Sequence, residues 1–228
     1  MATIEITVKV NDTESVTALL YPGSKRERAG VTVLLGHGAG ANQLSGFVRM
    51  FAVGLAVRGF DAMTFNFLYA EQKRSFPDPK ARLESCYRAV INAALKHKKL
   101  KTNRLVIGGK SMGGRIASQV AAAEADRIAG LVFLGYPLHP PGRPDKLRAE
   151  HLKDIHPPML FVQGSRDVFG TESEIRGVIK KLRLPATLYV VEGGDHSFKV
   201  SKSAGVPQQK VYEDVMDEVA AWSQNRLR

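Results

Sequence analysis

Residues 104–115 have the sequence RLVIGGKSMGGR, and this stretch decides which fold the chain is expected to adopt. Its first part is apolar and β-branched, as in a buried strand, and the small-residue stretch 116–123 that follows predicts a helix. Between them, residues 109–113 match the pattern G-x-S-x-G with Ser111 at its centre. On such a strand-to-helix turn the serine adopts a strained backbone conformation, which projects its hydroxyl above the sheet.

The residues around Ser111 favour a nucleophilic role for it. Gly109 and Gly113 lie two positions before and after the serine, where we expect their backbones to crowd each other and exclude a side chain. The N-terminus of the following helix favours negative charge that develops beside the serine. A phosphate-binding loop is excluded, because G-x-x-x-x-G-K-S requires glycine at position 104, where the chain has arginine. A glycine-rich turn without chemistry is the simpler alternative.

Short apolar runs alternate with helical stretches along the rest of the chain. Segments 3–10 and 15–20 are separated by a turn signal, so they predict a hairpin. Further strands are expected at residues 31–35, 60–65, 105–107, 131–134, 159–162 and 188–191. Amphipathic helices are expected at 47–58, 79–97 and 208–225. This order predicts a single α/β domain over residues 1–228, with a mostly parallel sheet and helices on both faces.

The composition excludes several classes of protein. The 228 residues are 44% hydrophobic and 24% charged, as in an ordinary globular domain. The one cysteine, Cys86, leaves no intrachain disulfide and no multi-cysteine zinc site. No apolar run approaches the roughly 18 residues of a membrane span, and the first residues lack the features of a signal peptide. We therefore expect a cytoplasmic protein without a membrane contact.

The charge is strongly positive, with 33 Lys and Arg against 22 Asp and Glu and a net charge of +11. Such a balance raises the possibility of a nucleic-acid partner. The basic runs at 25–28, 96–101 and 180–183, however, fall in an expected turn and at expected helix ends, where cations meet the negative end of the helix dipole. No zinc finger, RNA-binding sheet motif or aromatic interleaving accompanies them, so no nucleic-acid partner is expected.

A nucleophilic serine needs a general base, and the base needs an acid that orients it. Asp167 closely follows one expected strand and His196 follows the next, so both lie where open α/β sheets place their sites. The remaining histidines lie too early in the chain or away from strand ends. Asp195 is adjacent to His196 in sequence, and neighbouring side chains rarely face each other. The sequence therefore predicts a catalytic triad of Ser111, Asp167 and His196.

Two backbone N–H groups are expected to stabilise the oxyanion of the reaction. One belongs to Met112, and the other is assigned to Ala39 in the loop 36–41, GHGAGA, which His37 would brace. The same loop fits the dinucleotide-binding pattern G-x-G-x-x-[GA]. That alternative is disfavoured, because the next expected strand does not end in an acidic residue and the three triad side chains would have no role.

Four segments together resemble the signature segments of the α/β-hydrolases, namely residues 36–40, 109–115, 164–167 and 194–198. More narrowly, they resemble the dienelactone-hydrolase-like group. Within it the chain is most similar to the KANL/Tex-type hydrolase-like branch, because residues 65–69, FNFLY, resemble a segment of that branch. The resemblance implies an α/β-hydrolase fold with about eight strands, and serine-hydrolase chemistry.

Two departures from the relatives shape the functional expectation. The true dienelactone hydrolases use a cysteine where this chain has Ser111, which argues against their substrate. Many relatives have a helical lid, whereas residues 137–157 offer room for only a loop and a short helix, so little or no cap is expected.

The sequence as a whole predicts a serine hydrolase, specifically a carboxylesterase for a small-molecule acyl substrate, with an acyl-enzyme intermediate and no metal or cofactor. Lys73 and Arg74 follow segment 65–69 on the face expected to carry the site, so they are candidates for binding a substrate carboxylate. The alternative is a non-catalytic interaction module on the same fold, because the resembling branch includes subunits of complexes. The oligomeric state is left open.

Overall fold

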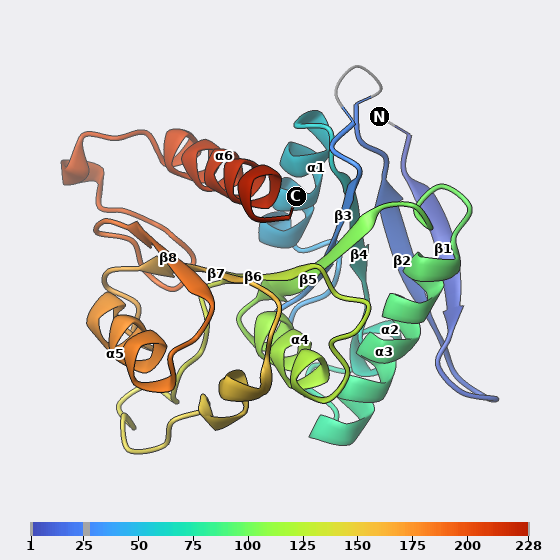
Figure 1. Cartoon of the computed structure of the whole chain (residues 1–228), viewed down its shortest axis with the longest axis horizontal. Coiled ribbons are helices and arrows are strands. Elements are labelled where there is room, and N and C mark those ends of the chain that lie inside the picture. The colour runs from blue at the N-terminus through green and yellow to red at the C-terminus, as the bar shows by residue number, and fades with distance from the viewer. Residues whose placement is uncertain (1, 25–27, 228) are drawn as a thin grey trace.

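One eight-stranded sheet organises the computed structural model, which describes residues 2–24 and 28–227 (Figure 1). The strand order is β1-β2-β4-β3-β5-β6-β7-β8. The strands are β1 (Ile4–Lys9), β2 (Ser15–Tyr21), β3 (Val31–Gly36), β4 (Asp61–Phe65), β5 (Arg104–Lys110), β6 (Gly130–Leu134), β7 (Met159–Gly164) and β8 (Ala186–Val191). The helices are α1 (Gly46–Val57), α2 (Leu68–Glu71), α3 (Lys80–Lys96), α4 (Met112–Ala123), α5 (Glu172–Leu182) and α6 (Gln208–Arg226).

The sheet is mostly parallel, as the sequence predicts. Strands β1 and β2 form the expected antiparallel hairpin, and β2 runs antiparallel to β4. Each remaining neighbouring pair, from β4 and β3 to β7 and β8, is parallel. The carboxyl ends of these parallel strands meet at one edge of the sheet, where open α/β folds carry their functional residues.

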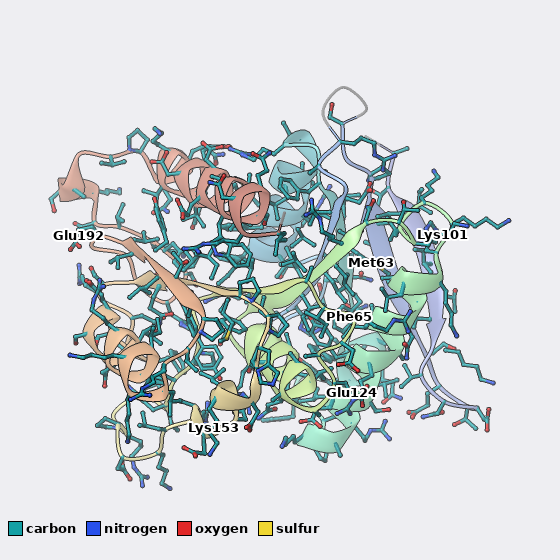
Figure 2. All side chains as sticks on the ribbon, viewed as in Figure 1. Met63, Phe65, Lys101, Glu124, Lys153 and Glu192 are labelled. Atoms are coloured by element: carbon teal, nitrogen blue, oxygen red, sulfur yellow. The ribbon has the colours of Figure 1, made fainter. Side chains whose placement is uncertain are left out.

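Helices cover both faces of the sheet, because its central strands are apolar on both sides. Figure 1 shows α1 and α6 on one face and α3, α4 and α5 on the other. Successive residues of β3 point to opposite faces, so Leu34 packs in the core beneath α3 and α4, while Val33 and Leu35 pack beneath α1 and α6. Figure 2 shows Met63 and Phe65 of β4 in the interior of the molecule.

Helix α4 begins earlier than its apolar pattern predicts. The sequence indicates a helix from Ile116, whereas the observed helix starts at Met112, directly after Ser111. The first turn contains Gly113 and Gly114, whose low helix propensity hides the start of the helix from a sequence pattern. This early start places the N-terminus of α4 beside the serine.

The connection between β6 and β7 contains no helical cap among the described residues. Between Leu134 and Met159 the chain forms turns and one short 3₁₀ helix, Glu150–Asp154. The expectation of a thin cover is therefore confirmed for this segment. None of the helices in residues 2–24 and 28–227 is both long and apolar enough to cross a membrane.

The basic runs lie largely where the sequence places them. Lys180 and Lys181 occupy the last turn of α5, and α3 ends within the run at Lys96. Residues 25–27 lie outside the described residues, while Arg28 of the same run pairs with the buried carboxylate of Asp61 at 2.6 Å. These cations thus have structural positions at helix ends or in an ion pair.

Candidate active site

Ser111 occupies a sharp turn between β5 and α4. Its backbone has φ 51° and ψ −114°, which is a strained conformation for a residue other than glycine. The Ser111 N–H donates to the Leu134 carbonyl at 3.2 Å, and the Arg115 N–H donates to the Ser111 carbonyl at 3.0 Å. The turn is thus held from both β6 and α4, and its strain is of the kind found where a reactive side chain is presented.

Gly109 and Gly113 both lie against the end of β3. The atoms that a side chain at either position would meet first belong to Gly36, rather than to the other glycine of the pair as expected. A Cβ at Gly109 would lie 2.1 Å from the Gly36 carbonyl oxygen, and one at Gly113 would lie 2.2 Å from the same atom. Both glycines therefore let the turn pack against the end of β3, which brings the loop after β3 next to Ser111.

Asp167 and His196, which follow β7 and β8, are in direct contact. The Nδ1 atom of His196 lies 2.7 Å from Oδ2 of Asp167, whose side chain is fully buried. The Asp167 carboxylate also accepts the Phe169 N–H at 2.8 Å. Because Nδ1 faces a carboxylate, it carries a proton, and Nε2 is left as the acceptor atom of the ring. This Nε2 is buried and has no hydrogen-bond partner among the described residues.

Asp195 is placed differently from Asp167, in agreement with the preference stated above. Its side chain accepts the N–H groups of Ser197 and Lys199 at 2.7 and 2.9 Å. It therefore caps the turn that carries His196, and the residue itself is exposed.

Gln163, at the end of β7, is a residue that sequence reasoning missed. Its amide nitrogen donates to Oδ2 of Asp167 at 2.8 Å and to the Gly170 carbonyl at 2.7 Å, while its amide oxygen accepts the Tyr136 N–H at 2.8 Å. The side chain is fully buried. A glutamine inside an otherwise apolar strand is the signal that could have identified it, because such a buried amide needs polar partners.

The loop after β3 is braced by His37, as the sequence predicts. His37 is fully buried, its Nδ1 lies 2.9 Å from the Gly38 carbonyl, and its Nε2 accepts the Phe67 N–H at 3.2 Å. The Tyr69 hydroxyl donates to the same carbonyl at 3.3 Å. Burial lowers the pKa of His37 to about 4. The ring is therefore neutral near pH 7 and holds the loop that carries Ala39.

A cavity of about 630 Å³ brings the predicted residues together. Ser111, His196, Met112 and Ala39 all line it. Its volume is within the range of small-molecule sites. Met112 is the first residue of α4, and N–H groups in the first turn of a helix have no intrahelical acceptor, so its amide is available to an oxyanion.

Lys73 and Arg74, the other predicted site residues, lie outside this cavity wall. Lys73 is exposed, and Arg74 forms an ion pair with Asp78 at 2.6 Å and also donates to Gln72. Asp78, in turn, is buried and lines the cavity. The structure thus brings Arg74 to the periphery of the site, where it neutralises a carboxylate of this chain.

Lys110 is a second residue that sequence reasoning missed. It lies directly before Ser111, is only 8% exposed, and its ammonium group donates to the backbone carbonyl of His196. The same nitrogen lies 5.4 and 5.9 Å from the ring centroids of Phe47 and Phe198. Burial lowers its pKa to about 8, although two nearby carboxylates oppose the shift. Lys110 thus links the serine turn to the histidine loop.

Replacing Lys110 with methionine should change how stability depends on pH. An ordinary lysine titrates near 10.5, so between pH 8 and 10.5 the unfolded chain binds more protons than the folded one. The wild type consequently gains about 3 kcal/mol in unfolding free energy across this window, because the burial penalty disappears as Lys110 loses its charge. Lys110→Met lacks this gain.

Urea unfolding at a series of pH values measures the effect as the difference in unfolding free energy between variant and wild type. As the pH rises from 8 to 10.5, the unfolding free energy of the wild type is expected to increase relative to that of the variant. The matched control is Lys101→Met, because Lys101 is exposed and projects from the edge of the molecule in Figure 2. A Lys110→Met difference as constant with pH as that of the control would contradict the prediction.

Comparison with known proteins places this chain in a wider group. Residues 29–224 match the family described as "Alpha/beta hydrolase domain". A serine hydrolase without a lid from Xanthomonas campestris has a similar structure, with a TM-score of 0.77 at 18% identity over 99% of this chain and 95% of that one.

Two further solved structures have the same architecture. A dienelactone hydrolase from Anabaena variabilis gives a TM-score of 0.77 at 19% identity, covering 100% of this chain and 99% of that one. An esterase from Pyrococcus furiosus gives 0.78 at 14% identity, covering 100% and 92%. At these identities the likeness describes the fold, which agrees with the sheet order and helix layers reported above.

Proposed function

Because this chain belongs to the alpha/beta hydrolase domain family, we propose that it is a serine hydrolase that cleaves carboxylic esters through a Ser111–His196–Asp167 triad. The observation that carries the proposal is the 2.7 Å contact of His196 with the buried Asp167, on the wall of the cavity that Ser111 also lines. The esterase and serine-hydrolase neighbours are consistent with this reaction class.

The reaction begins with proton transfer from Ser111 to His196. Nε2 of His196 has no other hydrogen-bond partner among residues 2–24 and 28–227, so it is free to accept the serine proton as Oγ attacks the acyl carbon. Asp167 holds the ring by its Nδ1–H and stabilises the imidazolium that forms. His196 then gives the proton to the departing alkoxide, leaving an acyl group on Ser111. Water, deprotonated by the same Nε2, releases the acid and restores the serine.

The negative charge on the tetrahedral intermediate is assigned to the N–H groups of Met112 and Ala39. Met112 is at the start of α4, where the helix dipole adds to the stabilisation. Ala39 is in the loop that His37 braces, and the packing of Gly36 against the serine turn fixes this loop next to the nucleophile. Donors that are in place before the reaction stabilise the developing charge without a cost of reorganisation.

Covalent labelling with a fluorophosphonate tests the proposal. The reagent reacts with a serine only where a base activates it and an oxyanion site accepts the phosphoryl oxygen. We expect one label per chain, located by peptide mass spectrometry at Ser111, together with hydrolysis of short-chain aryl esters. A chain that takes up no label, or takes it up at another serine, would support the non-catalytic interaction module instead.

A further inference from the structure

Two arginines on the cavity wall have no carboxylate partner among the residues that the structure describes. Arg115 of α4 and Arg148 of the β6–β7 connection both line the cavity that contains Ser111. Both are half-buried, and neither forms an ion pair with any carboxylate of the described residues. The Nε atom of Arg115 is buried and also lacks a hydrogen-bond partner there. Half-buried guanidinium groups usually pair with an anion, so this pair is unusual.

The backbones of the two arginines each accept a hydrogen bond from a buried hydroxyl group. The Ser118 hydroxyl donates to the Arg115 carbonyl at 2.7 Å, and the Tyr136 hydroxyl donates to the Arg148 carbonyl at 2.9 Å. The two hydroxyl oxygens are 3.4 Å apart, and both side chains are fully buried. The Arg148 N–H also donates to a β6–β7 loop carbonyl, that of Leu138, at 2.8 Å. The backbone at both positions is therefore held by hydrogen bonds.

The positive charges of Arg115 and Arg148 repel each other. Burial is the main cause that lowers the pKa of Arg115, and the positive charge of Arg148 lowers it further, while Tyr136 and Glu84 oppose the shift. The carboxylate that lines the same cavity, Asp78, is already paired with Arg74 at 2.6 Å. An external anion between Arg115 and Arg148 would relieve both the repulsion and the unmet hydrogen-bonding capacity.

We propose that Arg115 and Arg148 bind a carboxylate of the substrate, so that the esters which this site takes carry a second, free carboxylate group. This inference rests on the proposed esterase function and names its substrate class. Arg115 is four residues beyond Ser111 and donates its N–H to the serine carbonyl at 3.0 Å, so the anion would lie about one helical turn from the nucleophile.

The apolar part of the cavity wall narrows the substrate further. Leu83, Pro137 and Phe169 are among the residues that line the cavity. A short hydrocarbon spacer between ester and carboxylate fits such a surface. The planar guanidinium fork of each arginine matches the geometry of a carboxylate.

Half-esters of short dicarboxylic acids test the inference with catalysis as the readout. The mono-4-nitrophenyl esters of glutaric and adipic acid carry the free carboxylate, and their methyl diesters are the neutral counterparts. Arg115→Gln and Arg148→Gln are each expected to lower kcat/KM for the half-esters about 10- to 100-fold, which is the effect of losing a charge-assisted hydrogen bond. The neutral diesters should change less than about threefold.

Arg143→Gln is the matched control. Arg143 lies in the same β6–β7 connection, but it is exposed and pairs with Asp145. It should leave the rates of both ester classes unchanged. Equal losses for half-esters and diesters in the two cavity variants would overturn the inference, because they would mean that the arginines act only on the structure of the site.

A binding measurement keeps this inference separate from the proposed function. In the Ser111→Ala protein, which has no nucleophile, monomethyl glutarate and dimethyl glutarate are titrated by calorimetry. We expect saturable binding of the monoanion and at least tenfold weaker binding of the diester, with the difference removed by Arg115→Gln. No saturable heat from the monoanion, or equal affinity for both, overturns the carboxylate site. If the monoanion binds but the wild type hydrolyses no ester, the esterase proposal fails and the anion site stands.

Discussion

Replacing Ser111 with alanine is expected to lower ester hydrolysis by a factor of about 10⁴ or more. The variant removes the nucleophilic oxygen but leaves the oxyanion donors and the cavity in place, so only their weak residual catalysis remains. The substitution should fold normally, since the Ser111 contacts that hold the turn use its N–H and carbonyl rather than its side chain. Steady-state kinetics with an aryl ester measure the loss.

Ser45 provides the internal comparison for this prediction. It lines the same cavity, but it lies outside the strand-to-helix turn, and the hydrogen bonds described for it use its backbone N–H and carbonyl. Ser45→Ala is expected to reduce the rate no more than about tenfold. Similar losses in the two variants would show that the cavity, rather than an activated serine at position 111, limits the reaction.

The second large effect is expected from Asp167→Asn, which should lower kcat for ester hydrolysis about 10⁴-fold. Asparagine has nearly the same shape as aspartate, so the fold should stay the same. The aspartate accepts the Nδ1–H of His196 and so leaves Nε2 as the base. An asparagine amide can donate to Nδ1 instead, which would place the proton on Nε2 and remove the base. The measurement is kcat against pH, together with thermal unfolding to show that the variant is folded.

Asp195→Asn is the matched change for Asp167→Asn. Asp195 is adjacent to His196, yet its carboxylate accepts two N–H groups of the same turn and is exposed. A loss of less than about tenfold is expected from it. If Asp195→Asn were the more damaging variant, the orienting role would belong to Asp195 and the assignment of Asp167 would be wrong.

The arrangement of Asp167 and His196 could be predicted because backbone topology alone determines it. Each residue follows an apolar run, and the carboxyl ends of neighbouring parallel strands must meet at one edge. The strand pattern therefore brings the two together without any knowledge of side-chain packing. The bounds of most strands and of α1, α3 and α6 follow from the same periodicity.

The residues that were missed depend on where long side chains point. Lys110 and Arg115 both belong to the G-x-S-x-G region, but a sequence does not reveal that one reaches the His196 carbonyl and the other the cavity. Arg148 lies in a loop far along the chain, so its nearness to Arg115 depends on the tertiary structure. Arg74 is predicted to bind substrate, but it lies outside the cavity wall and its charge is paired with Asp78, which the sequence pattern does not reveal.

The glycines around the serine show the limit of local reasoning in another way. The pattern indicates that Gly109 and Gly113 must be small, and this is so, but the obstacle is Gly36, more than 70 positions away in sequence. The motif indicates that these two positions must be small, but it does not indicate which residue packs against them.

Substrate preference and the reacting groups of the site depend on different parts of the chain, because the connection between β6 and β7 supplies part of the cavity wall. The proposed nucleophile, base and oxyanion donors lie in the segments that follow the carboxyl ends of β3, β5 and β8, whereas Pro137 and Arg148 come from an irregular connection. Loops tolerate substitution and insertion far better than buried strands. Such a chain can acquire a new substrate preference by changes in one peripheral segment, while the reacting groups and the stability of the sheet are left untouched.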